Sequence, residues 1–308
     1  MMKKLSAILL SISFLTCNSL PASNITSLTF NDVSRGWNSD SLARMYFHHS
    51  ETQRQWAWES LSKVSLSGNE KILDFGCGDG KVSAEMARLV RNGSVLGVDV
   101  SEKMIHLAKI YFPSYAFPNL TFQNSESVTF ADMPGQQDYD LVCAFTVFHL
   151  ISNPLDVLKN LKTHLKPSGK LLLIIPTGKN QALYQAANEV FPKYNLETPW
   201  NNKIQGSERS MRTLDGCSSF LNEAGYQIES MEIIDTDNPF YDMDDFIAWM
   251  MGTATATWQI PASLSQVFFT DLVHRMYELD PSIIDEEGRF RFKMPRLHAT
   301  AVPSLQID

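Results

Sequence analysis

Short apolar runs alternate along the chain with segments whose apolar residues recur every three or four positions. Five runs predict buried strands, because each is short, apolar and followed by a turn or a helix: 71–75, 95–100, 120–123, 140–145 and 170–175. The helical spacing predicts helices over 82–90, 102–110 and 155–165, the last ended by Pro167 and Gly169. Alternation of this kind predicts a parallel sheet with helices on both faces. Ligands of such sheets bind at the carboxyl ends of the strands.

Helical patterns dominate the segments that flank this core. Residues 37–66 carry aromatic and apolar residues at helical spacing and predict one or two helices. Downstream of residue 176 we expect, in order, a helix within a cap segment (177–212), a helix (214–224), a sixth strand (227–234), two helices (near 242–251 and 263–279) and a last strand (289–302).

These elements define an expected architecture. The fold class is α/β, with a doubly wound, mostly parallel, seven-stranded sheet and a helical cap inserted before the last strand. We expect one domain over 37–302, with a ligand-binding core at 70–176 and cap segments at 177–212 and 240–285.

Composition and charge exclude several classes of protein. Apolar residues make up 44% of the chain and charged residues 19%, which suits a large buried core and not a disordered chain. The formal net charge of −8 lacks the basic field of a non-specific nucleic-acid binder, so no nucleic-acid partner is expected. No apolar run reaches about 18 residues, so no transmembrane segment is expected.

The first 22 residues have the order of a secretory signal. Lys3 and Lys4 precede a short apolar run, and small residues around Ala22 offer a cleavage point. The alternative is an upstream extension, with Met45 as the true start. The remaining cysteines favour a reducing compartment, because two of them lie in or beside predicted strands and suit buried thiols. Both localisations, export and cytoplasm, therefore stay open at this point.

The chemistry concentrates in the turn after the first strand, residues 74–80. Its glycines permit positive φ angles and let the backbone approach a ligand closely. The following helix directs its free amide groups at that ligand. Asp99, at the end of the second strand, can accept both hydroxyls of a ribose. The alternative is a structural tight turn beside an unrelated aspartate. The G-x-G-x-G spacing also differs from the G-x-G-x-x-G of dinucleotide-binding proteins.

Four stretches together resemble the class I S-adenosylmethionine-dependent methyltransferases. They are ILDFGCGDG (72–80), VLGVDVSEKMI (95–105), YDLVCAFTVFHLI (139–151) and LKPSGKLLLIIP (165–176). The resemblance implies the Rossmann-like methyltransferase fold, S-adenosyl-L-methionine as cofactor and a small-molecule acceptor. YFHHSETQRQ (46–55) and EEGRFRFKMPRLHATA (286–301) are similar to the trans-aconitate and juvenile-hormone-acid methyltransferase type. That finer likeness implies O-methylation of a carboxylate.

The resemblance also implies roles for individual residues. The methionine part and ribose of the cofactor would be held by Asp74, Gly76, Gly78, Gly80, Asp99 and Val100. Met104 would pack on the adenine, Phe145 would line the methyl end, and Tyr46 with Gln53 would close a lid over the cofactor. The third-strand motif departs from the family. Ser125 stands where an Asp usually contacts the adenine amine, and the amide of Glu126 would also reach the ring, so adenine affinity is in doubt.

Residues for the acceptor are assigned with alternatives. An ionised carboxylate needs no general base, whereas other nucleophiles do, and His149 is the candidate base. A packing or capping role is its alternative. Arg209 and Arg212 could clamp a substrate carboxylate, or form an exposed basic face. Trp249, within the aromatic stripe of the cap, could wall the acceptor pocket or belong to the core.

Three competing functions remain open from the sequence. One is a non-catalytic S-adenosylmethionine-binding protein, motivated by Ser125. Another is a nicotinamide-dependent dehydrogenase, disfavoured by the glycine spacing. A third is an exported protein that uses the fold for another ligand. The histidines lack metal-ligand spacing, so no metal is expected, and we expect a monomer.

Overall fold

The computed structural model describes residues 36–125, 138–151, 153–178, 180–199, 210–235 and 237–304. The predicted signal segment (1–22), Glu126 and Arg209 lie outside the described residues. Within the described ranges, no helix combines the length and the apolar character needed to cross a membrane.

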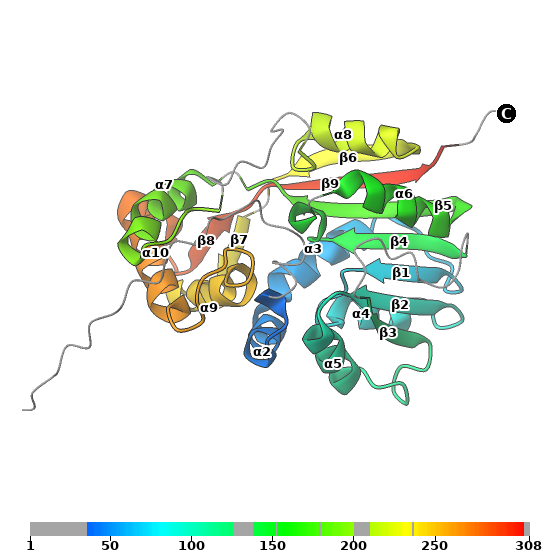
Figure 1. Ribbon diagram of the computed structural model, residues 1–308, viewed down its shortest axis with the longest axis horizontal. Helices are drawn as coiled ribbons and strands as arrows, with labels where there is room; N and C mark the ends of the chain where they lie inside the picture. Colours follow the sequence, from blue (N-terminus) through cyan, green and yellow to red (C-terminus); the bar gives the residue numbers. More distant parts are fainter. Residues whose placement is uncertain are drawn as a thin grey trace, which may run out of the picture.

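A seven-stranded sheet forms the centre of the molecule (Figure 1). Its strands run in the order β3-β2-β1-β4-β5-β9-β6. Their bounds are β1 Lys71–Phe75, β2 Ser94–Asp99, β3 Leu120–Asn124, β4 Tyr139–Phe145, β5 Leu165–Pro176, β6 Tyr226–Ile234 and β9 Arg296–Pro303. Strands β1 to β5 pair in parallel, and β9 lies antiparallel between β5 and β6. The predicted fold class is therefore confirmed.

Helices cover both faces of this sheet. Alternate residues of each strand point to opposite faces, so Ile72 and Leu73 belong to two different core clusters. One face carries α3 Glu51–Leu61, α4 Lys81–Leu89 and α5 Glu102–Tyr111. The other carries α6 Pro154–His164 and α8 Leu214–Glu223. Strand β1 after Lys71 and the stretch Leu171–Ile175 of β5 are fully buried as a result, which explains their continuous apolar runs.

The predicted element boundaries hold where a side chain caps the helix. Ser101 Oγ accepts the Met104 amide at 3.1 Å and begins α5. The expectation that Pro167 and Gly169 end the next helix is wrong. Helix α6 ends at His164, and Leu165 already begins β5 by pairing with Tyr139. The early start is accommodated by a register shift between Tyr139 and Leu141.

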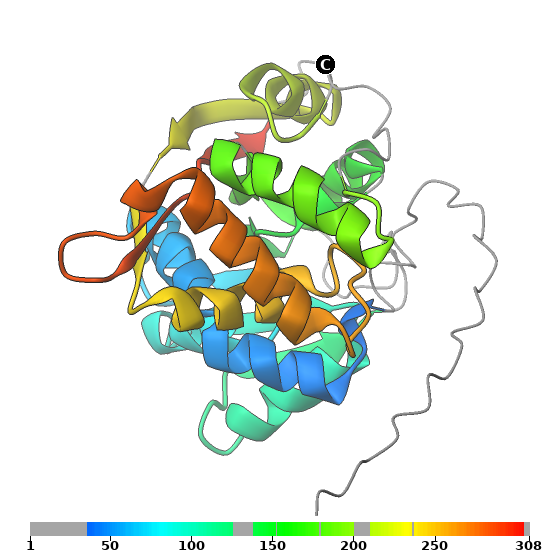
Figure 2. The same cartoon turned by 90° about the vertical axis from the view of Figure 1, so that its left-hand side faces the viewer.

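The cap lies beside the carboxyl ends of the parallel strands (Figure 1), and it faces the viewer in Figure 2. It consists of α7 Gln181–Val190, α9 Met243–Ala254, α10 Ser265–Leu279 and a small two-stranded sheet, β7 Asp237–Phe240 with β8 Phe290–Lys293. Phe246 stacks on Phe290 and Trp249, with centroid separations of 4.2 Å and 5.6 Å. Most of the predicted aromatic stripe is therefore the core of the cap, whereas Tyr241 is exposed.

One predicted strand is two strands in the structure. The stretch 289–302 was expected to form a single last strand, but Met294 and Pro295 interrupt it. Proline has no amide hydrogen for a ladder bond, so the chain leaves the small sheet after β8 and enters the main sheet at β9. Strand β7, which contains Pro239, was not expected at all.

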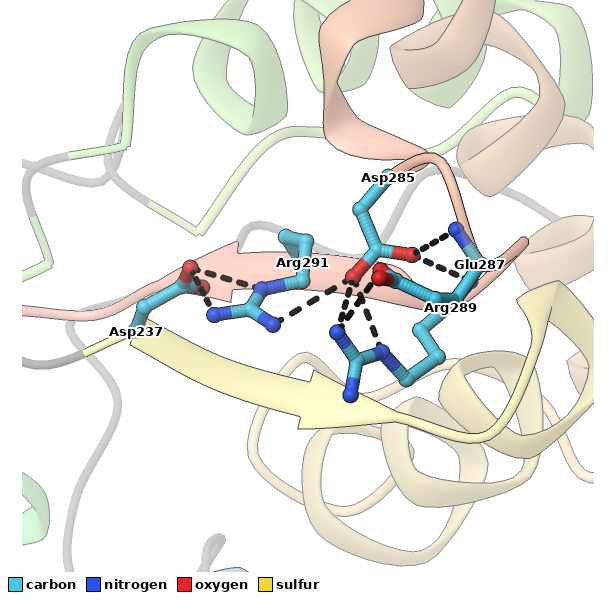
Figure 3. Close-up of polar contacts among 5 residues, drawn as sticks. All are labelled: Asp237, Asp285, Glu287, Arg289 and Arg291. Carbon is cyan, nitrogen blue, oxygen red and sulfur yellow. Dashed lines mark hydrogen bonds and ion pairs between the residues drawn. The ribbon is translucent and has the colours of Figure 1, made fainter.

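Charged side chains on β7, on β8 and in the turn before β8 form a network, called the β7–β8 network below (Figure 3). Arg291 binds Asp237 at 2.7 Å and Asp285 at 3.3 Å, and Arg289 binds Asp285 and Glu287, each at 2.9 Å. The network is largely exposed, so screening by water limits its contribution to stability.

Helix α2, Asp40–His49, connects the cap to the sheet. It packs against α9 at Gly252, where an added Cβ would lie 3.3 Å from the Met45 carbonyl oxygen. The same helix reaches α5, because Ala43, Met104 and Leu107 form one buried cluster. Helices α2 and α3, called the lid helices below, thus lie between the cap and the carboxyl ends of β1 and β2.

Candidate active site

The glycine turn after β1 is fixed by its backbone. The amides of Gly76 and Cys77 both donate to the Val98 carbonyl, at 2.8 Å and 3.0 Å, and tie the turn to β2. Gly76 has a φ of +75°, and an added Cβ would lie 2.2 Å from Val147 Cγ2. Only glycine fits there, because a side chain would collide with the segment that follows β4.

The other two glycines of the turn differ in what surrounds them. Gly80, at φ +79°, is closed in, since an added Cβ would lie 2.7 Å from Phe122 Cζ and 2.8 Å from Ala108 Cβ. Gly78, at φ +51°, has only Tyr46 Cε1 nearby, at 3.5 Å. The open side of the turn therefore faces the lid helix α2, as expected for a loop that receives a ligand from that direction.

Three carboxylates gather at this turn. Asp99 accepts the Gly78 amide at 2.9 Å and the Ser101 amide at 2.8 Å. Asp74 is 3% exposed and accepts the hydroxyl of Ser83. Burial, together with repulsion from Asp99 and Asp79, raises the pKa of Asp74 to about 7. Burial likewise raises the pKa of Asp79 and of Asp99.

This crowding suits a cationic nucleoside ligand. Buried carboxylates that repel one another are stabilised when a positive charge enters between them. S-adenosylmethionine carries a sulfonium and an ammonium group, and Asp99 keeps unused lone pairs for ribose hydroxyls. The residues present therefore fit this cofactor.

A contact between the turn and the lid helices, called the latch below, involves four residues. Ser50, between α2 and α3, donates to Asp79 Oδ2 at 2.6 Å. Lys81 Nζ donates to Ser50 Oγ at 2.9 Å and to the Phe47 carbonyl, and lies 4.3 Å from the centre of the Phe47 ring. A cation at the last carbonyls of α2 also complements the helix dipole. The latch thus joins the lid to the first turn of α4.

Tyr46 and Gln53, the expected lid residues, both lie over the turn. Tyr46 packs edge to face on Trp37, with centroids 5.4 Å apart, and burial and the nearby Asp79 raise the pKa of its hydroxyl. Gln53 accepts the indole N–H of Trp249 at 3.2 Å. The structure therefore brings Trp249 to the lid.

The lid and the turn enclose a small cavity of about 30 Å³. It is lined by Tyr46, Ser50, Gln53, Arg54, Asp74, Gly76, Cys77, Asp79, Lys81, Val82, Phe145 and Thr146. That volume holds roughly one water molecule, whereas ligand pockets typically measure about 300–1,000 Å³. A nucleoside ligand therefore requires the lid helices to move outward.

Two segments, one after β4 and one before α8, bring His149 and Arg212 together. Thr146 follows β4 with a φ of +54°, a conformation rare for threonine. Three residues later, the His149 carbonyl accepts from Arg212 Nη2 at 3.2 Å, and His149 Nδ1 is buried with no hydrogen-bond partner among the described residues. Burial and the adjacent Arg212 lower the pKa of His149 to about 3. The imidazole is therefore neutral and a weak base at neutral pH.

The remaining residues implied by the resemblance lie near the carboxyl ends of the parallel strands. Phe145 lines the cavity, and Met104 is buried beneath α2. Val100 and Ser125 follow β2 and β3, and the Ser125 amide donates to the Asp99 carbonyl at 3.0 Å. Among the described residues, no group of three or more potential ligands is placed to hold a metal ion.

Sequence reasoning missed the latch. Asp79 belongs to the quoted glycine motif, but Ser50 and Lys81 carry no recognisable pattern, because their contact depends on how the lid packs. Arg296 was also missed. It is fully buried in β9, lies 4.5 Å from the Trp56 ring centre and binds Glu59 at 2.8 Å. An arginine within an alternating strand is ordinarily expected on the solvent side.

Comparison with known proteins agrees with this geometry. A family model described as a methyltransferase domain matches residues 66–225. The trans-aconitate 2-methyltransferase of Variovorax paradoxus is 24% identical over 263 residues, covering 83% of this chain and 96% of its own.

Two solved structures share the fold. A putative methyltransferase from Bacillus halodurans superposes with a TM-score of 0.54 at 15% identity, covering 81% of this chain and 99% of its own. The phosphoethanolamine N-methyltransferase 2 of Haemonchus contortus, in complex with S-adenosylhomocysteine, gives 0.55 at 15% identity, covering 93% and 61%.

The chain belongs to the class I S-adenosylmethionine-dependent methyltransferases. The family match spans the glycine turn, the acid at the end of β2 and all five parallel strands. The protein is therefore an enzyme that uses S-adenosyl-L-methionine. This membership excludes the alternative function of a nicotinamide-dependent dehydrogenase. The match gives no support to the predicted signal segment, which lies outside it.

Proposed function

We propose that the enzyme transfers the methyl group to a carboxylate oxygen of a small organic acid. The observation that carries this proposal is the state of Arg212. Its guanidinium is partly buried and donates a hydrogen bond to the His149 carbonyl at 3.2 Å. Among the described residues, no carboxylate lies within ion-pair distance of Arg212. Burial accordingly lowers its pKa.

A partly buried arginine that meets no carboxylate in the described part of the chain favours an anionic acceptor. Its planar fork of N–H groups matches a carboxylate and holds it in two parallel hydrogen bonds. Arg212 stands next to the segment after β4, whose Phe145 and Thr146 line the cleft. The likeness to a trans-aconitate methyltransferase, whose name specifies an acid, supports the same class of acceptor.

The proposed chemistry asks the protein mainly to position its ligands. When bound, S-adenosylmethionine supplies an electrophilic methyl group on sulfur. We propose that Asp74, Asp99 and the three glycines hold it, that Met104 and Ser125 flank its adenine, and that Tyr46 and Gln53 exclude water. An acceptor carboxylate is already ionised at neutral pH, so His149, with its lowered pKa, is proposed as a packing group and not as the base.

The test is methyl transfer from labelled cofactor to a panel of acids, amines and phenols. Methyl esters release methanol in mild base, whereas N-methyl products do not, so the product identifies the acceptor atom. Substitution Arg212→Gln should raise the KM for the acid more than tenfold, because a charge-assisted bond is lost. Cofactor affinity should stay unchanged. Turnover of amines alone would contradict the proposal. Cofactor binding without any transfer would favour the non-catalytic alternative.

A further inference from the structure

One hydrogen bond joins the cap to the lid beside the cavity at the glycine turn. Trp249, on α9, donates its indole N–H to Gln53 Oε1, on α3, at 3.2 Å. An indole nitrogen donates and does not accept, so the side of the Gln53 amide that faces Trp249 must be its oxygen. The tryptophan therefore fixes which way the amide is turned, and the NH₂ group of Gln53 lies on the side away from Trp249.

The indole that imposes this orientation is itself held by the core of the cap. Trp249 is 4% exposed. Its ring stacks on Phe246, and the Phe240 and Phe292 rings lie beside it, with centroid separations of 5.4 Å and 5.8 Å. A side chain packed at this density does not turn freely. Because the bond joins the lid to the cap and not to the glycine turn, outward movement of the lid from the turn need not break it.

The NH₂ group of Gln53 is available to a ligand. Gln53 lines the cavity between the lid and the turn. No residue in the described part of the chain accepts a hydrogen bond from its Nε2. Two other polar lid residues of the same lining already have acceptors, because Ser50 donates to Asp79 and Arg54 pairs with two glutamates. Gln53 thus carries N–H donors that a bound molecule can use.

The charges around the cavity indicate which group of the cofactor meets these donors. The methionine part of S-adenosylmethionine carries an ammonium group and a carboxylate. Asp74 and Asp79 line the turn side of the cavity, where they attract the cations of the cofactor and repel its carboxylate. Tyr46 also reaches that side, because its Cε1 lies 3.5 Å from the position of an added Cβ on Gly78. The carboxylate is therefore expected on the lid side, where Gln53 lies.

We propose that Trp249 is a positioning residue for cofactor binding. From the cap, it turns the Gln53 amide so that the N–H groups of Gln53 hold the carboxylate of the cofactor's methionine part. Gln53 touches the cofactor, whereas Trp249 acts only through Gln53. The inference depends on the use of S-adenosylmethionine and not on the identity of the acceptor.

The experiment compares two ligands that differ in one group. S-adenosylmethionine and decarboxylated S-adenosylmethionine, which lacks only the carboxylate, are titrated into the full-length protein by calorimetry without any acceptor. Trp249→Phe keeps an aromatic ring in the cap but removes the N–H, so the Gln53 amide loses its fixed orientation. The dissociation constant for S-adenosylmethionine should rise about fivefold, and that for the decarboxylated ligand should not change.

Two variants of Gln53 test whether Trp249 acts through this amide. Gln53→Glu keeps an oxygen for Trp249 and replaces the NH₂ group by an anionic oxygen. It should weaken binding of S-adenosylmethionine at least about tenfold without weakening binding of the decarboxylated ligand. In a Gln53→Met background there is no amide to turn, so adding Trp249→Phe should cause no further change.

Trp56→Phe is the matched control. It removes another indole N–H between α3 and the cap, one that donates to Asn238 at 2.8 Å, and should leave the affinity for both ligands unchanged. Four results would each overturn the proposal: equal weakening of both ligands by Trp249→Phe, an equal effect of Trp56→Phe, unchanged S-adenosylmethionine affinity in Gln53→Glu, or additive effects of Trp249→Phe and Gln53→Met.

Discussion

The glycine turn and the cap both shape the site, but they are encoded differently. In the turn, positions such as Gly76 are fixed by backbone geometry that one residue type alone satisfies. In the cap, Phe246 and Trp249 pack on residues about 45 positions away, and many apolar residues would fill that space. Local backbone requirements leave a motif in the sequence, whereas distant packing leaves only composition. The effects of substitutions on stability and cofactor affinity should therefore differ in size between the two regions.

The largest effect is expected for Gly76→Ala. The added methyl group would meet Val147 and place alanine at a φ of +75°. We expect a loss of about 3 kcal/mol in the free energy of unfolding and at least a hundredfold weaker cofactor binding. Denaturant unfolding and calorimetry measure the two quantities.

Gly288→Ala in the cap is the matched control. Its φ is similar, at +81°, but an added Cβ would meet nothing within 4 Å. Only the backbone strain of about 1 kcal/mol remains, and cofactor affinity should not change. Equal losses in both variants would show that the clash at Gly76 is unimportant.

The next effect is expected at the latch. Lys81→Met removes the cation that binds Ser50 and the Phe47 carbonyl, while it keeps the length of the side chain. The closed lid should lose about 1.5 kcal/mol. Because the cofactor requires the lid to move outward, the dissociation constant of the cofactor should fall about tenfold in calorimetry.

Lys63→Met provides the comparison for the latch. Lys63 pairs with Glu232, and both side chains are about half exposed. Loss of such a surface pair should leave cofactor affinity unchanged. A similar fall of the dissociation constant in both variants would mean that general charge, and not the latch, controls affinity.

A smaller effect, graded with pH, is expected from Asp74. Its pKa is raised from 3.8 to about 7, so between these values the folded state binds more protons than the unfolded state. The stability of the cofactor-free protein should therefore fall as the pH rises through this window, because the carboxylate ionises in a buried site. Thermal unfolding of Asp74→Asn should show a weaker fall.

The cofactor should reverse this trend. Its positive charges favour the ionised form of Asp74, so the ratio of wild-type to Asp74→Asn affinity should rise about tenfold from pH 6 to pH 8. Taking the ratio cancels titration of the cofactor itself. A ratio that stays flat would contradict the raised pKa of Asp74.

The smallest effect is expected from a substitution in the β7–β8 network. Glu287 binds Arg289 on the surface, and its side chain is 66% exposed. Glu287→Gln should change neither the melting temperature nor cofactor affinity measurably. A clear drop in melting temperature would show that the β7–β8 network is more cooperative than exposed ion pairs usually are.

The sequence was sufficient to predict the parallel core. The runs at β1, β4 and β5 are apolar on both faces, and the turn after β1 shows its glycines directly. The sequence was insufficient for β7 and for the break between β8 and β9. Pro239 and Pro295 weaken the strand pattern there, and the pairing of these short strands is set by partners distant in the sequence. The direction of Arg212 was likewise not predictable, since it depends on how the segments after β4 and before α8 meet.

The position of β9 has a consequence for how the protein is made. This strand, residues 296–303, occupies the place between β5 and β6 and supplies both with hydrogen bonds. A nascent chain on the ribosome therefore carries two unsatisfied strand edges until that segment emerges. Completion of the sheet must follow synthesis of nearly the whole domain, and until then those edges are open to pairing with a neighbouring chain.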